Sequence, residues 1–382
     1  MFQALKKVYK KIDWILFASV LVIACAGLIT MNSFLPGQAG TVDSHLFNRQ
    51  IIWLIISIFL FFGASFVDWS FLKNSTVIVS LLVLSVVLLL LLFSLGSLIK
   101  GAKSWFNLGA FSFQPTDAIK LVIILTLAKY FSRRHIEIAN VRHILVSGFY
   151  VFIIFLLVFF QPALGSAIII FFLWLGMVLV SGISKKHLLA VFLIGLLSFA
   201  GLWFFLLKPY QKDRIKNFIH PLTDIRGSGY NAYQSMITVG SGEIFGKGIG
   251  LGSQSKLQFL PEYQTDFIFA AFAEEWGFVG VVLLFILYGI VFYRMLQISF
   301  RGGGNFEILF GFGLTILFFV HFFIHVGMNI GLLPVTGLTL PFMSYGGSHL
   351  LSEFLGLGML MSMKRYSREV HKDIAKNEMI GV

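Results

Sequence analysis

Ionisable residues inside apolar segments are the first candidates for chemistry in this chain of 382 residues. Asp117 and Lys120 stand three apart in an apolar stretch that begins after Pro115, so a helix places both on one face near its start. Charged groups are costly inside a bilayer and mark functional sites by default. Two interpretations stay open: the pair neutralises itself so that the helix enters the bilayer, or it offers a cation and a carboxylate to a polar cavity.

Asp266 is the second candidate, because it directly precedes the apolar run that starts Phe267-Ile268-Phe269. This is the place of a helix N-cap, whose side chain accepts free amide hydrogens. From the residues alone capping is the favoured interpretation of Asp266, and a functional carboxylate is the alternative. Glu274 and Glu275 follow about two turns later, and adjacent helical residues do not share a face. At least one of these two carboxylates therefore needs a partner outside the bundle interior.

His321 and His325 are four residues apart, a spacing compatible with a metal ion. The accompanying Glu of the zinc-protease motif is absent, and no Cys or acidic residue lies nearby in the sequence, so helix packing or hydrogen bonding is favoured. Trp105 is compatible with an aromatic anchor at the membrane surface. Ser344 belongs to a flexible turn before the last apolar run and forms no evident serine–histidine pair.

The composition shows what kind of element must position these residues. Charged residues make up 12% of the chain and hydrophobic residues 58%, whereas soluble proteins average about 25% charged residues. The net charge of +12 would suit a nucleic-acid partner only if the basic residues gathered on one folded face. They stand instead at the ends of apolar runs, as membrane topology requires. The sequence indicates a polytopic membrane protein and argues against nucleic acid as a partner.

A spanning helix needs about 20 apolar residues. Such runs fall at about 14–33, 50–67, 77–95, 115–132, 144–160, 163–183, 187–207, 266–293, 306–326 and 348–363. We therefore predict an all-α polytopic membrane protein with about ten transmembrane helices, built as a single domain over residues 1–382.

The distribution of Lys and Arg predicts the orientation. The connections on the side of the N-terminus are richer in these residues, and most basic residues of the other side sit in one long loop, which influences orientation little. Both termini are thus expected in the cytoplasm, and the connections at 34–49, 96–114, 208–265 and 327–347 outside. Residues 208–265 form a large extracytoplasmic loop between the seventh and eighth spans. Apolar residues at helical spacing around Tyr233 to Val239 indicate that this loop is partly ordered.

The order of the motifs resembles that of the SEDS family of bacterial cell-wall synthesis, and the resemblance covers nearly the whole chain. The matching segments are GAKSW at 101–105, FQPTDAIK at 113–120, PYQKDRI at 209–215, GSGYNAYQS at 227–235, GSGEIFGKG at 240–248, FLPEYQTDFIF at 259–269, AEEWGFVG at 273–280 and NIGLLPVTGLTLPFMSYGGS at 329–348.

This resemblance implies a peptidoglycan glycosyltransferase that polymerises lipid II in the bacterial inner membrane, with its active face extracytoplasmic. The family's essential aspartate falls on Asp266, which favours catalysis over capping there. Candidate substrate-binding residues are Lys120, Asp117, Trp105, Arg214, Lys247, Lys256, Glu262 and Ser344. The elongation branch of the family is the better match, with the division and sporulation branches as alternatives. A class B penicillin-binding protein that supplies transpeptidase activity is the implied partner.

The chain departs from the family pattern at several positions. Asp117 stands where a Glu is usual, Ala163 where an Asp is usual, and His349 and Glu353 where small or amide residues are expected. Either the missing carboxylate is dispensable or Glu353 compensates for it. A divalent cation, Mg²⁺ or Mn²⁺, is compatible with a pyrophosphate leaving group, although no ligand set fixes one. A lipid II flippase and a non-catalytic scaffold are the competing functions.

Overall fold

The fold is an all-helical membrane bundle with ordered connections at one end. The computed structural model describes residues 12–33, 42–99, 102–107, 109, 112–133, 141–220, 227, 229–257 and 259–380. Its long helices are α2 (Trp14–Ser33), α3 (Val42–Phe66), α4 (Ser75–Leu95), α5 (Pro115–Ser132), α6 (Val141–Phe160), α7 (Leu164–Val180), α8 (Lys185–Gly201), α12 (Ile268–Phe300), α13 (Asn305–Asn329) and α14 (Gly347–Ile380). Each predicted span corresponds to one of these helices.

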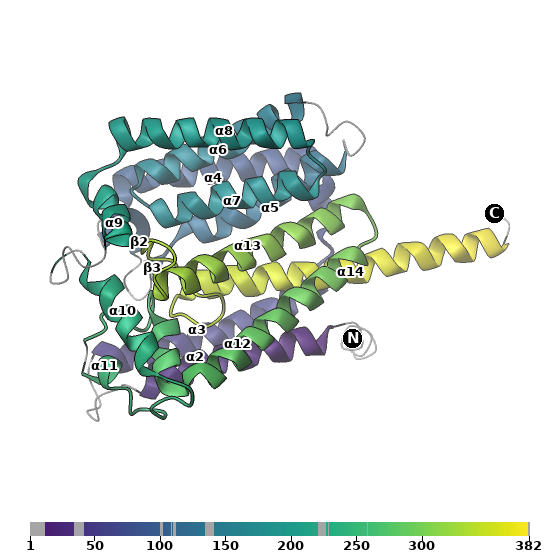
Figure 1. Cartoon of the computed structure of the whole chain (residues 1–382). Helices are drawn as coiled ribbons and strands as arrows, with labels where there is room; N and C mark the ends of the chain where they lie inside the picture. Colours follow the sequence, from purple (N-terminus) through teal and green to yellow (C-terminus); the bar gives the residue numbers. More distant parts are fainter. Residues whose placement is uncertain are drawn as a thin grey trace.

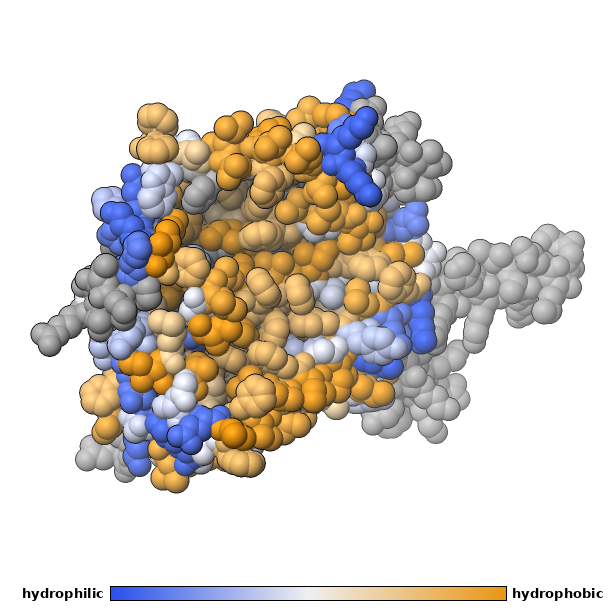
Figure 2. Space-filling model, viewed as in Figure 1, coloured by the Kyte–Doolittle hydropathy of each residue, from blue (hydrophilic) through white to orange (hydrophobic). Residues whose placement is uncertain are grey.

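Within the described residues, seven helices are long and apolar enough to cross a membrane, and α7 is a shorter apolar helix. Their outward side chains include exposed Phe59, Leu197 and Phe205, which lipid rather than water would cover. Figure 2 shows the same arrangement, with hydrophobic residues across the middle of the molecule and hydrophilic ones gathered at its two ends. The membrane class predicted from the composition is confirmed.

The shorter elements gather at one end of the bundle, which we call the loop end (Figure 1). They are β1 (Ser97–Ile99), β2 (Ala102–Asn107), β3 (Ser112–Phe113), α9 (Pro209–Ile219), α10 (Tyr230–Ser241) and α11 (Ser253–Lys256). The start of α2 and the far part of α14 lie at the opposite end. A short η1 (Trp69–Lys73) joins α3 to α4, and a π-helical turn, η2 (Leu202–Leu206), extends α8.

The structure differs from the predicted elements in two places and agrees with the prediction in a third. Helix α3 starts at Val42 rather than near residue 50, because the polar stretch before Ile51 continues the helix. The connection at 96–114 contains a three-stranded antiparallel sheet in the order β1-β2-β3, which the sequence did not predict. Helix α10 confirms the order expected around residues 233–239 in the long loop.

Helix α12 is broken at Gly277, which has φ +64° and ψ −169°. The loop that follows α10 fills the break: Phe278 N–H donates to Glu243 O at 2.9 Å, and Val279 N–H donates to Ile244 O at 3.1 Å. Backbone groups inside a membrane must find partners within the protein, and this loop supplies them. The segment before the break is therefore a short helix, fixed to the loop end of the bundle.

A carboxylate joins the helices at the opposite end. Asp13 accepts hydrogen bonds from Arg294 Nε at 3.1 Å and Nη2 at 2.6 Å, and lies 3.5 Å from Lys364 Nζ. Burial alone would raise the pKa of Asp13, but the bonds from Arg294 and from Leu16 N–H, with the charges of Lys364 and Arg294, lower it overall. Asp13 thus ties the start of α2 to α12 and α14.

Candidate functional site

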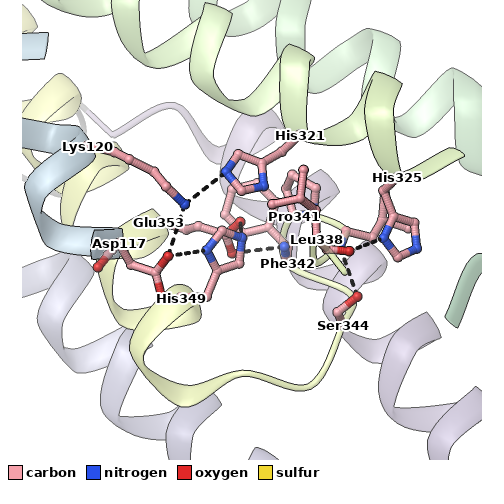
Figure 3. A network of polar contacts seen from close by, with 12 residues as sticks. Asp117, Lys120, His321, His325, Leu338, Pro341, Phe342, Ser344, His349 and Glu353 are labelled. Atoms are coloured by element: carbon pink, nitrogen blue, oxygen red, sulfur yellow. Dashed lines mark hydrogen bonds and ion pairs between the residues drawn. The ribbon is translucent and has the colours of Figure 1, made fainter. Parts of the chain in front are cut away.

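Five ionisable side chains from three helices form a buried group, called the ion cluster here: Asp117, Lys120, His321, His349 and Glu353 (Figure 3). Pro115 and Asp117 both lie in the first turn of α5, and Lys120 follows one turn later on the same face. Lys120 Nζ donates to Asp117 Oδ1 at 3.1 Å and lies 3.3 Å from His321 Nε2 on α13. The predicted pair on one helical face is present, and it has a third partner.

His349 stands between the two carboxylates of the cluster. Its Nδ1 is 3.5 Å from Asp117 Oδ1, and its Nε2 is 2.9 Å from Glu353 Oε1. Ser348 Oγ–H donates to the other oxygen of Asp117 at 3.2 Å. The side chains of Lys120 and Asp117 are only 3% and 5% exposed, so the cluster is held almost out of contact with solvent. Buried charges persist only when they are paired in this way.

A small cavity of about 10 Å³ lies inside the cluster, with Leu121, Leu317 and Phe318 completing its walls. This volume is at the lower limit for a single water molecule. Asp117 and Lys120 thus form an ion pair with each other and also line a small cavity. A pyrophosphate group does not fit into a cavity of this size.

The connection between α13 and α14, residues 330–346, joins the ion cluster to the segment before α12. We call it the last outer loop, after the side of the membrane on which the sequence predicts it. At one side, Phe342 N–H donates to Glu353 Oε2 at 2.9 Å. At the other, Ser344 Oγ accepts from Leu340 N–H and donates to Thr265 O, both at 2.8 Å. Ser344 is 4% exposed and acts here as a link between two pieces of backbone.

Asp266 lies in a turn just before α12, at the loop end of the bundle. The N-cap of α12 is Phe267, which makes no side-chain capping bond, so Asp266 does not occupy the predicted N-cap position. The carbonyl oxygen of Glu262, itself at φ +54°, accepts the N–H groups of Thr265, Asp266 and Phe267 at 3.1, 3.1 and 3.3 Å. Asp266 is half-buried. A Cβ placed on Gly337 of the last outer loop would lie 3.4 Å from Asp266 Oδ2, so the carboxylate faces that loop.

Asn329, at the end of α13, fixes the backbone around Asp266 and was not predicted as a site residue. Its Nδ2 donates to Asp266 O at 3.2 Å and to His325 O at 2.8 Å, while its Oδ1 accepts from Ala270 N–H at 3.3 Å. Ser235 Oγ–H on α10 donates to Asn329 O at 3.0 Å. An amide residue at the end of a long apolar run is the sequence signal that could have identified it.

Comparison with known proteins places this arrangement in a family. Residues 12–369 match the family model described as "Cell cycle protein", which groups FtsW, RodA and SpoVE. The chain belongs to this family. Its members are the SEDS proteins, so the resemblance drawn from the motifs is confirmed.

Curated SEDS relatives are similar over most of their length. Stage V sporulation protein E of Bacillus subtilis is 34% identical over 358 residues, which are 91% of this chain and 97% of the relative. Peptidoglycan glycosyltransferase MrdB of Escherichia coli K12 is 37% identical over 77% of this chain and 79% of the relative. A probable peptidoglycan glycosyltransferase FtsW of Haemophilus influenzae is 37% identical over 74% of this chain and 72% of the relative.

Solved SEDS structures share the fold. A chain from work on the structural coordination of polymerization and crosslinking by a peptidoglycan synthase complex is 31% identical, with a TM-score of 0.78 over 93% of this chain and 98% of that one. The rod shape determining protein RodA of Thermus thermophilus, known from a crystal structure, is 30% identical in sequence. Its TM-score is 0.69 over 92% of this chain and 96% of that one.

Glu274 holds the long loop of this SEDS protein in place. Its Oε1 accepts from Lys247 Nζ and from Gln254 N–H, both at 2.9 Å, and its Oε2 accepts from Ser255 Oγ at 2.9 Å. Glu275 accepts from Gly250 N–H at 2.7 Å. The two adjacent carboxylates thus have different partners, as expected. Lys247, predicted to bind substrate, is engaged in an ion pair with a fully buried carboxylate.

The remaining predicted residues lie at the loop end on separate elements. Trp105 is half-buried on β2, where it pairs with Ser97 of β1. Arg214 is half-buried on α9, and Lys256 is exposed at the end of α11. The structure brings Asp117 and Lys120 together, and it connects Ser344 and Glu262 to the turn that carries Asp266.

The two histidines of α13 have separate hydrogen-bonding partners, in agreement with the packing interpretation. His321 contacts Lys120, whereas His325 Nδ1 lies 2.7 Å from Leu338 O. Over the part of the chain that the structure describes, no group of three or more His, Cys, Asp or Glu side chains is placed to hold a metal ion. The described side chains therefore provide no ligand set for a resident cation.

Proposed function

We propose that this SEDS protein is a peptidoglycan glycosyltransferase that polymerises lipid II into glycan strands and releases undecaprenyl pyrophosphate. The names of its relatives MrdB and FtsW support the reaction class. The observation that carries the proposal is the placement of Asp266. This half-buried carboxylate is held at the loop end by bonds to its own turn and by Asn329, next to the last outer loop.

The proposed reaction is a single displacement with inversion. The 4-hydroxyl of the N-acetylglucosamine of one lipid II attacks the anomeric carbon of the terminal N-acetylmuramic acid of the growing strand. The carbon–oxygen bond to undecaprenyl pyrophosphate breaks as the new glycosidic bond forms, and Asp266 takes the hydroxyl proton as the general base. A base that lies on ordered backbone keeps its carboxylate within reach of that proton.

The leaving pyrophosphate needs positive charge placed in advance. Lys120 is enclosed in the ion cluster, and Lys247 is paired with Glu274. We assign contact with the pyrophosphate to Lys256, which is exposed on the long loop, with Arg214 of the same loop as a second candidate. In this scheme Lys120 and Asp117 support the site from inside the bundle, while Trp105 and Glu262 lie at its edge.

Within the family we propose the elongation role, as in RodA. The basis is Gln161-Pro162, the GSG of residues 240–242 and the FLPE of residues 259–262. Similar relatives come from the sporulation and division branches as well, so this assignment stays a proposal. We further propose that the chain resides in the bacterial inner membrane with its loop end outside and both termini in the cytoplasm, and works with a class B penicillin-binding protein.

A lipid II flippase is the competing function, and the break in α12 is the observation that favours it. Broken helices often line transport sites in membrane proteins. Here, however, the amides after Gly277 bond to Glu243 O and Ile244 O of the protein itself. The predicted site residues Trp105, Arg214, Lys256 and Asp266 also lie on or next to elements at the loop end of the bundle (Figure 1). Both features support chemistry at one membrane face over alternating access.

Purified protein and lipid II separate these functions. We expect glycan strands on a gel, with more product when the cognate penicillin-binding protein is present. Parallel reactions with a chelator and with added Mg²⁺ or Mn²⁺ test the need for a cation. Movement of labelled lipid II across vesicles without polymer would instead establish a flippase. If the protein with its partner bound neither polymerises lipid II nor moves it across vesicles, the protein is a non-catalytic scaffold.

A further inference from the structure

Phe342 of the last outer loop has a backbone conformation that its side chain does not favour. Its φ is +62°, in the left-handed region that bulky residues rarely adopt. Such a conformation persists only where the surrounding structure determines it. Phe342 is 2% exposed, and its ring packs edge-on against the rings of Phe318 and Phe354. The ring centroids are 5.1 Å and 5.7 Å apart, respectively. The ring is therefore anchored in the core, and the backbone needs a restraint of its own.

Glu353 supplies that restraint from the first turns of α14. Its Oε2 accepts the N–H of Phe342 at 2.9 Å, and the carboxylate is 2% exposed. Its Oε1 lies 2.9 Å from His349 Nε2, whose ring continues to Asp117 Oδ1 at 3.5 Å (Figure 3). One oxygen of this buried carboxylate thus lies at ion-pair distance from an imidazole, while the other accepts the hydrogen bond from the loop.

The last outer loop is in turn hydrogen-bonded to the turn before α12. Two residues after Phe342, Ser344 Oγ–H donates to Thr265 O at 2.8 Å, and Tyr345 N–H donates to Gln264 O at 2.9 Å. Thr265 directly precedes Asp266. The path from α14 to Asp266 therefore consists of one carboxylate, a few loop residues and three hydrogen bonds.

We propose that Glu353 is a positioning residue for the reaction: it holds Phe342 in its left-handed conformation and so sets the last outer loop that places Thr265 and Asp266. This inference rests on the proposed function for its effect on rate, and on geometry alone for its effect on the loop. The ion cluster then acts as the buried support of the catalytic turn, while the substrate stays outside its cavity.

The test compares Glu353→Gln with Glu353→Met in the full-length protein in nanodiscs. Glutamine keeps an oxygen that accepts the Phe342 N–H, whereas methionine keeps the bulk of the side chain and removes the acceptor. Two quantities are measured for each: amide hydrogen exchange over residues 338–346 and 262–268, and kcat and KM for lipid II. We expect Glu353→Met to exchange faster in both segments and to lose about 10- to 100-fold in kcat, with KM changed by less than about threefold. In Glu353→Gln, the exchange rates of both segments and kcat should stay close to the wild-type values.

Asp13→Asn is the matched control, because Asp13 is also a buried carboxylate that accepts a backbone N–H, that of Leu16 at 3.2 Å, but at the opposite end of the bundle. It should leave exchange in both segments unchanged. Ser344→Ala, measured in parallel in case methionine prevents folding, should reproduce the faster exchange at 262–268 and the loss of kcat.

Wild-type exchange in Glu353→Met or Ser344→Ala would overturn the proposal, as would equal losses of kcat in Glu353→Gln and Glu353→Met. If wild-type protein makes no polymer but Glu353→Met still accelerates exchange in both segments, the proposed function fails and the positioning link stands.

Discussion

The side-chain amide of Asn329 donates a hydrogen bond to the backbone carbonyl of Asp266 at 3.2 Å, and its oxygen accepts the N–H of Ala270 at 3.3 Å. One buried amide at the end of α13 thus spans the first turn of α12 and fixes the residue proposed as the base. The position of Asp266 depends on a side chain that stands 63 residues away along the chain.

Replacing Asn329 with Ala should weaken both stability and catalysis. It leaves buried backbone groups without partners, which costs about 1–3 kcal/mol of unfolding free energy. The polymerisation rate at full occupancy should fall further, because the turn that carries Asp266 loosens. Asn74→Ala is the control: Asn74 caps α4 through the Thr76 N–H and its loss costs about 1 kcal/mol of helix stability. Equal activity in the two variants would argue against the role given to Asn329.

The Asp117–Lys120 pair should behave as a coupled unit. Lys120→Met leaves Asp117 as a buried carboxylate without its main cation, and breaking a buried pair in this way costs about 3–5 kcal/mol. Adding Asp117→Asn removes the uncompensated charge, so the double variant should be more stable than Lys120→Met alone. Unfolding of the purified variants by denaturant measures this. A double variant at least as unstable as the sum of the single ones would show that the pair is not coupled.

Gly277 should accept no side chain. Its φ of +64° with ψ −169° is a conformation reserved for glycine, and an added Cβ would lie 2.1 Å from Gly246 N. Gly277→Ala should therefore displace the loop from the break in α12 and reduce the yield of folded protein. Gly63→Ala is the matched control, since a Cβ there meets nothing within 4 Å. Size-exclusion chromatography after membrane extraction compares the two variants, and equal yields would contradict the account of the break.

The sequence was sufficient to predict the helices and to single out Asp117 and Lys120 as a pair inside one of them, because apolar runs and charged residues within them are local signals. It predicted Asp117 and Lys120 on one face and separate partners for Glu274 and Glu275. It did not predict the sheet at 97–113, whose strands are too short for a clear alternation. Nor did it predict the bonds from Asn329 to Asp266 and from Glu353 to Phe342, since contacts of this kind depend on how helices and loops pack.

Asp266 also shows where local reasoning was wrong. A carboxylate before an apolar run suggested an N-cap, but the helix begins later, with Phe267 as its N-cap. The three hydrogen bonds to Glu262 O define the turn instead. Glu262 itself has a positive φ, which cannot be predicted from the presence of a glutamate.

The most direct test of the central claim is the rate of lipid II polymerisation by the Asp266→Asn variant beside wild-type protein. Asn has nearly the same shape as Asp but cannot take the hydroxyl proton. The rate should therefore fall by about 10²–10⁴-fold, while the unfolding transition stays unchanged. Asp213→Asn, which changes a half-exposed carboxylate on α9 at the same end, should polymerise normally. Glycan strands formed at near wild-type rate by Asp266→Asn would contradict the assignment of Asp266 as the base.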